Sequence, residues 1–191
     1  MKKFYPTVFF AATGSLLLFN TTFAGPFSIS VGIPQKHTFT EKFDHEKGLE
    51  TGSSSGFFLG FKFPIGIGLG MDRYETKIDH TSSKLYTNIY NIFFQFPIPL
   101  LNLTIGLGSG KTKLDCSSCA EDNTGEDDKK ENYRSGTANQ WYTSLGLQLS
   151  SLLDIHFSYR SVKSKMIEQV SSGEKVDFSG TVKGIGVMFN F

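Results

Sequence analysis

The feature that most constrains this chain is an alternation of apolar residues with small or polar ones. At the carboxyl-terminal end, the apolar positions are Ile185, Val187, Phe189 and Phe191. Successive side chains of a β-strand point to opposite sides, so a period of two predicts a strand with one apolar face. The same pattern recurs at about 27–33, 56–63, 65–72, 86–96, 101–108, 140–149 and 153–160. The sequence therefore predicts an all-β protein of eight strands.

The connections between these strands alternate between long and short. Polar stretches at about 35–55, 77–84, 110–136 and 164–175 are long. The segments between them are tight turns at Pro64, Phe96–Pro99 and Ser150–Leu152. In an antiparallel up-and-down meander, odd connections emerge at one end and even connections at the other. This asymmetry is typical of transmembrane β-barrels, which have long loops on one side and short turns on the other.

A soluble ligand-binding barrel also has one apolar and one polar face, so the composition of the second face has to decide. That face is mostly Gly, Ser, Thr, Asn and Gln. Its isolated charges include Lys62, Asp72, Asp154 and Arg160. Small residues suit the narrow interior of an eight-stranded barrel, which leaves the apolar face to contact lipid. Aromatic residues near the strand ends are candidates for interfacial girdles: Phe57, Phe63, Tyr86, Phe94, Phe96, Trp141, Tyr159, Phe189 and Phe191.

The amino-terminal segment has the features of a secretory signal peptide. Lys2 and Lys3 precede an apolar run at 8–19, and small residues occur at 22–24. The run is shorter than the roughly 20 residues that a transmembrane helix needs. We therefore expect cleavage after Ala24 and a single barrel domain at 25–191. With 19 Lys and Arg against 18 Asp and Glu, the chain lacks the basic excess of a nucleic-acid-binding protein.

Taken together, the leader, the eight alternating strands and the alternating connection lengths resemble the small eight-stranded outer-membrane barrels of the OmpA/OmpX type. The resemblance covers residues 25–191 and is closest to members without a periplasmic domain. It implies a place in the cell outer membrane. It also implies that the last strand carries the signal read by the barrel-assembly machinery, namely Ile185, Val187, Phe189 and Phe191.

The third long connection contains the two cysteines, Cys116 and Cys119. In an oxidising compartment they are expected to form a disulfide. A redox site is disfavoured because no strand–helix context surrounds the pair, and two thiols are too few for zinc. The acidic stretch that follows at 121–128 does not match an EF-hand, so we expect a solvated loop and no metal or other cofactor.

His156 is distinctive because it lies within a predicted strand, whereas His37, His45 and His80 fall in predicted loops. His156, Ser158 and the later Glu168 faintly resemble the catalytic residues of outer-membrane lipid A deacylases. The strand parity, however, turns His156 and Ser158 inward, and Glu168 falls in a predicted loop. We therefore expect an interior polar network formed by Lys62, Asp72, Asp154, His156 and Arg160.

These observations predict a non-enzymatic, monomeric barrel with a structural or interaction role, either in adhesion or in envelope integrity. An eight-stranded lumen is filled by side chains, which disfavours a diffusion pore. The expected partners are outer-membrane lipid including lipopolysaccharide, the assembly machinery, and a host or cell-surface ligand held by the loops near 35–55 and 110–136. Two alternatives are a lipid A-modifying enzyme and a soluble periplasmic lipid-binding barrel.

Overall fold

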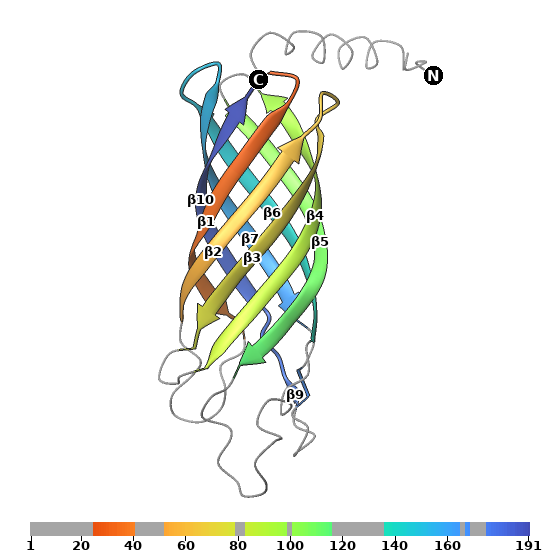
Figure 1. The fold of residues 1–191 in the computed structure, drawn as a ribbon, viewed down its shortest axis with the longest axis vertical. Coiled ribbons are helices and arrows are strands. Elements are labelled where there is room, and N and C mark those ends of the chain that lie inside the picture. The colour runs from red at the N-terminus through yellow and green to blue at the C-terminus, as the bar shows by residue number, and fades with distance from the viewer. Residues whose placement is uncertain are drawn as a thin grey trace, which may run out of the picture.

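In the computed structural model the chain forms a closed eight-stranded antiparallel barrel (Figure 1). The structure describes residues 25–40, 52–78, 83–98, 101–115, 136–164, 167–168 and 175–191. The barrel strands are β1 (Ser28–Phe39), β2 (Gly52–Lys62), β3 (Ile67–Lys77), β4 (Lys84–Ile98), β5 (Leu101–Asp115), β6 (Gly136–Gln148), β7 (Leu153–Ser164) and β10 (Gly180–Asn190). Among the described residues, no helix is long and apolar enough to cross a bilayer.

Each barrel strand pairs with its neighbours along the chain, and β10 closes the circle by pairing with β1. The closing register extends from Ser28 opposite Asn190 to Phe39 opposite Gly180. The prediction of an eight-stranded antiparallel up-and-down barrel is confirmed. The leader at 1–24, the cysteine pair and the acidic stretch at 121–128 lie outside the described residues, so those expectations stay predictions.

The two ends of the barrel are built differently. At the short-turn end, the chain reverses at 63–66 and 149–152. Gly66 donates its amide hydrogen to the Phe63 carbonyl at 3.0 Å and has a φ of 82°, which favours glycine. The opposite, long-connection end carries the connections that follow β1, β3, β5 and β7. The last of these contains a small hairpin of β8 (Ile167–Glu168) and β9 (Lys175–Val176), drawn at the lower end of Figure 1.

Several strands are longer than the sequence pattern predicted. Strand β1 continues past a register shift between Pro34 and Lys36 and ends at Phe39, within a segment predicted as a loop. Strand β5 likewise continues to Asp115. The turn predicted at Phe96–Pro99 was placed too early, because Pro97 and Ile98 still pair with β5. The fourth long connection, expected to be a polar loop, contains the β8–β9 hairpin.

The extra residues were missed because the polarity of the strands reverses within the barrel. On β5, the outward side chains of Ile105 and Leu107 are 46% and 63% exposed and therefore face lipid. Further along the same strand, Lys111 and Lys113 point outward while Leu114 is buried inside. A pattern with the apolar face outside thus becomes one with the apolar face inside. The first suits a bilayer and the second suits water.

Aromatic side chains lie at both borders of the lipid-facing band. Toward the long-connection end, the rings of Trp141 and Tyr159 lie 5.9 Å apart. Pairs near the short-turn end include Phe61 with Phe63, at 5.0 Å, and Phe94 with Phe96, at 4.7 Å. Rings at these depths match the interfacial girdles of membrane barrels.

Inside the barrel, large rings lie over glycines on the neighbouring strand. A Cβ atom added at Gly106 would lie 2.2 Å from the ring of Tyr142, its registered partner. The same relation holds between Gly68 and Phe93, where the distance would be 2.1 Å. The inward glycines therefore provide the space that lets large side chains fill a narrow lumen.

The replacement Gly106→Ala is expected to destabilise the barrel by about 1–3 kcal/mol, because the new methyl group overlaps the Tyr142 ring. Gly32→Ala is the matched control, since its added Cβ would meet no atom closer than 3.1 Å. Urea unfolding in lipid vesicles, followed by fluorescence of the single tryptophan, Trp141, measures both. Equal losses of stability in the two variants would contradict this packing account.

Candidate functional site

The described lumen contains a buried ion pair between Asp72 on β3 and Arg160 on β7. Arg160 Nε donates to Asp72 Oδ2 at 2.9 Å, and Nη2 lies 3.5 Å from Oδ1. Both residues are at most 5% exposed. Gln140 Nε2 also donates to Asp72 Oδ2 and reaches Asn91 Oδ1 at 2.7 Å. Side chains from β3, β4, β6 and β7 are thereby tied together across the barrel.

Two aromatic rings enclose the guanidinium group of Arg160. Its Cζ atom lies 3.5 Å from the centre of the Phe58 ring and 4.9 Å from the centre of the Tyr142 ring. A desolvated cation is attracted to aromatic faces. The fork of Arg160 is therefore held by a carboxylate and by two rings, which fixes its position in the lumen.

Asp154 and His156 lie inside β7, nearer the short-turn end. Asp154 is fully buried and its Oδ2 accepts a hydrogen bond from Asn102 Nδ2. His156 Nδ1 lies 3.3 Å from Ser144 Oγ, whereas Nε2 is 3.8 Å from Asp154 Oδ2, too far for a hydrogen bond. Lys62 Nζ lies 3.4 Å from the Gly25 carbonyl and interacts electrostatically with Asp154.

The predicted interior residues thus fall into two groups, with Asp72 and Arg160 in one and Lys62, Asp154 and His156 in the other. The deacylase-like residues are not brought together among the described atoms. Ser158 Oγ accepts a hydrogen bond from Arg160, while His156 contacts Ser144. Glu168 belongs to β8, and its side chain lies outside the described residues.

A small cavity separates these groups. It has a volume of about 50 Å³, and its lining includes Thr104, Ser144, His156, Ser158 and Arg160. This volume has room for about three water molecules. An acyl chain or a sugar would not fit, so the side chains here can order water but cannot surround a lipid substrate.

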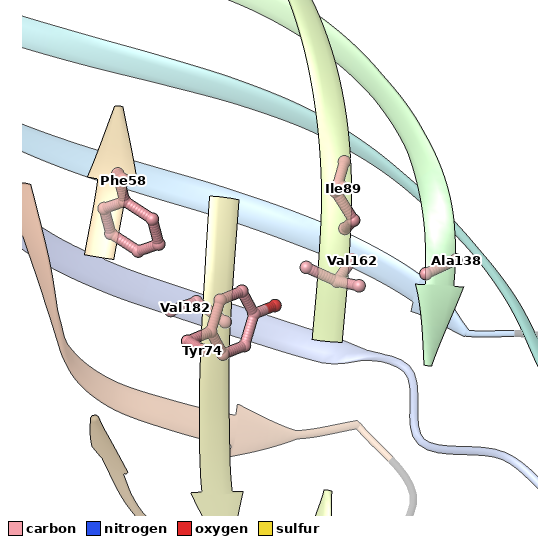
Figure 2. Close-up of a cluster of buried hydrophobic side chains, with 6 residues drawn as sticks. All are labelled: Phe58, Tyr74, Ile89, Ala138, Val162 and Val182. Carbon is pink, nitrogen blue, oxygen red and sulfur yellow. The ribbon is translucent and has the colours of Figure 1, made fainter. Parts of the chain in front are cut away.

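Toward the long-connection end, the lumen becomes apolar. One cluster contains Phe58, Tyr74, Ile89, Ala138, Val162 and Val182 (Figure 2). A second contains Phe39, Ile78, Leu85, Leu114 and Phe178. These side chains come from all around the barrel and fill its interior between the ion pair and the long-connection end. The prediction of a small, polar inner face is therefore wrong for this half of the lumen.

His37 is also corrected by the structure. It was predicted to lie in a surface loop, yet it is an inward residue of β1 with no exposed surface. Its Nδ1 atom lies 2.9 Å from Thr76 Oγ1, and its ring centre lies 4.4 Å from that of Phe39. The alternation of His37 and Phe39 with Lys36 and Thr38 was the available signal, but the bulge at Pro34 interrupts its phase.

The polar residues that sequence reasoning missed are Asn91, Asn102, Gln140 and Ser144. Each lies on an inward position of its strand, but an isolated amide or hydroxyl on that face carries no specific signal. Within the described residues, no group of three or more His, Cys, Asp or Glu side chains is placed to hold a metal ion.

No protein-family model and no curated protein matches this sequence. Similarity to solved structures is clear at the level of fold. Neisserial surface protein A (NspA) has a TM-score of 0.63 and 14% sequence identity, covering 88% of this chain and 99% of its own. The outer membrane protein W of E. coli has a TM-score of 0.50 and 10% identity, covering 90% and 100%.

This chain has the fold of the small eight-stranded outer-membrane barrels. The resemblance inferred from the alternating strands is confirmed at that level. A closed barrel with an apolar band on its outside is suited to span a lipid bilayer with its strands.

Replacing Asp72 with Leu is expected to destabilise the barrel by about 3–5 kcal/mol, because Arg160 would remain buried without its counter-ion. The double variant Asp72→Leu/Arg160→Met should recover most of that loss. Asp115→Asn, at an exposed outward position, is the control and should have little effect. Trp141 fluorescence during urea unfolding measures all three, and a double variant no more stable than the single one would refute the pairing.

Proposed function

We propose that this protein is a membrane scaffold that presents its long connections at the cell surface, where they bind a ligand on a host cell, on another cell or in the envelope. The observation that carries the proposal is the filled lumen. Packed side chains fill the interior. The long connections are therefore the part of the protein that offers varied polar and charged side chains to a ligand outside the cell.

The packing of the lumen argues against a role as a diffusion pore. Arg160, which is paired with Asp72, lies against the rings of Phe58 and Tyr142, and two apolar clusters fill the lumen toward the long-connection end. A solute would have to displace charged and aromatic groups together, at a cost in both pairing and packing. The packing of the described side chains therefore supports a scaffold rather than a pore.

The geometry around His156 also argues against a lipid A-modifying enzyme. A nucleophile and its base must lie within hydrogen-bonding reach and must be open to the substrate. His156 and Ser158 instead bind different partners, and both border a cavity of about 50 Å³. A soluble lipid-binding barrel is disfavoured as well, because large apolar side chains such as Leu69, Ile92 and Leu107 are exposed on the outside of the barrel.

The third long connection, at 116–135, is the first candidate for ligand binding because it is the longest of the four and is rich in charge. Loops carried on a rigid scaffold commonly hold binding residues. The barrel strands that flank this connection, β5 and β6, pair through twelve registered positions and so provide a rigid base.

Replacing 116–135 with a short Gly-Ser linker is expected to abolish adhesion of expressing cells to host cells or to one another, while the barrel still folds. The same replacement of 79–82, in a connection not singled out for ligand binding, is the control. Surface display, checked by an epitope tag, and adhesion counts measure the effect. Unchanged adhesion in both variants, at equal display, would refute the binding role.

We also propose that Ile185, Val187, Phe189 and Phe191 act as the signal for barrel assembly. All four point outward on or just after β10, the strand that closes the barrel. Phe191 is 54% exposed, and its backbone exchanges two hydrogen bonds with Phe27. An aromatic residue in this place is accessible before closure and becomes part of the interfacial girdle afterwards.

Phe191→Ser is expected to slow assembly into the outer membrane severalfold. Phe63→Ser is the matched control, because Phe63 is an exposed aromatic residue near the same end but is not on β10. Pulse-labelling followed by the heat-modifiable gel shift measures the assembly rate. Equal rates in the two variants would show that Phe191 has no special role.

A further inference from the structure

The outward face of the barrel carries a strongly basic zone next to the lipid-facing band, on the side of the long connections. On the described barrel strands, its basic residues are Lys36, Arg73, Lys77, Lys84, Lys111, Lys113, Lys163 and Lys183. The acidic residues on the same outward face are Glu75 and Asp115. At the short-turn end, the described outward positions hold no charged side chain. The positive charge is therefore confined to one side of the membrane.

Within this zone, β2 to β5 form a groove with a volume of about 650 Å³. Two rows of outward residues cross it in register. One row contains Arg73, Asn88 and Lys111, and the other contains Glu75, Tyr86 and Lys113. Phe57 lies opposite Arg73 on β2 and completes the first row. The groove thus combines three cationic groups with an amide and two aromatic rings.

The charges in the groove are not balanced by the protein residues that the structure describes. Glu75 is already engaged, because its Oε1 atom lies 3.5 Å from Lys84 Nζ and accepts a hydrogen bond from Ser55 Oγ at 3.2 Å. Arg73, Lys111 and Lys113 make no ion pair with any described carboxylate. Arg73 on β3 and Lys111 on β5 lie two strand spacings apart, roughly 10 Å, on either side of Asn88, so an anion bound between them would be attracted by both.

The depth of the groove indicates which anion it meets. On β5, Lys111 follows the lipid-facing Leu107 by four residues, or roughly 13 Å along the strand. On β4, Tyr86 and Asn88 lie on the long-connection side of the lipid-facing Tyr90. The cationic groups are therefore at the level where lipid headgroups begin, and the long stems of lysine and arginine suit that border.

We propose that this groove binds the phosphorylated headgroup of a lipid in the leaflet at the long-connection end. Arg73 offers a planar fork that can hold two phosphate oxygens, and Lys111 and Lys113 add positive charge. Phe57, in the same row as Arg73, packs against the first carbons of the lipid, whereas Tyr86 lies beside Lys113 in the row farther from the lipid-facing band. This binding is independent of any ligand that the long connections bind.

The test compares the triple variant Arg73→Gln/Lys111→Gln/Lys113→Gln with a matched control, Lys36→Gln/Lys163→Gln/Lys183→Gln. Each variant loses three outward charges from the same zone, but on different strands. The folded full chain, in neutral detergent, is titrated with bisphosphorylated lipid A, with dephosphorylated lipid A and with inorganic phosphate. Native mass spectrometry measures the bound fraction.

The expected result is that the wild type and the control bind bisphosphorylated lipid A with affinities within about threefold. The groove variant should bind at least tenfold more weakly, since each charge at a membrane surface is worth about fivefold. Equal loss in both variants would overturn the proposal in favour of diffuse charge attraction. Equal binding of dephosphorylated lipid A, or displacement by equimolar inorganic phosphate, would also overturn it.

Discussion

Closure of the sheet between β1 and β10 is the constraint on which the rest of this structure depends. In lipid, an unpaired backbone amide or carbonyl costs several kcal/mol, so a sheet can cross a bilayer only when it has no edge. The closing pairs, from Ser28–Asn190 to Phe39–Gly180, remove that edge. Closure with eight strands also sets a narrow lumen, and the width of the lumen then decides which side chains can point inward.

The narrow lumen explains the placement of both its glycines and its charges. Tyr142 can point inward because Gly106 faces it, and Phe93 can do so because Gly68 faces it. Once desolvated by such packing, a charge must be paired, and Asp72 and Arg160 meet that requirement across the barrel. The same strands therefore provide both the space for the inward rings and the partners of the buried charges.

The reversal of polarity along each strand separates two environments in one barrel. Near the short-turn end, apolar residues face outward to lipid. Toward the long-connection end, residues such as Tyr74 and Leu114 face inward while Arg73 and Lys113 face outward to water or headgroups. The same alternation of apolar and polar residues therefore places the apolar face outside within the bilayer and inside toward the long-connection end. This explains how a filled, inert interior and a basic, exposed rim arise from continuous strands.

The sequence predicted the lipid-spanning part of the fold well, because a run such as Leu101, Leu103, Ile105 and Leu107 keeps one apolar phase. It failed where the phase reverses, as at Lys111–Asp115, or where a bulge shifts it, as before His37. It could name Asp72 and Arg160 as interior charges, but their direct pairing depends on the barrel register across 88 residues. The groove of Arg73, Lys111 and Lys113 required the same register to be known.

The most direct test of this account is the depth profile of outward positions on β5. Spin labels at Ile105, Leu107, Ser109 and Lys111, each through a single cysteine in a Cys116→Ser/Cys119→Ser background, report exposure to oxygen in lipid and to a water-soluble nickel chelate. The account predicts that oxygen dominates at 105 and 107 and that the chelate dominates at 111. Chelate access at all four positions, in a correctly folded barrel, would contradict it.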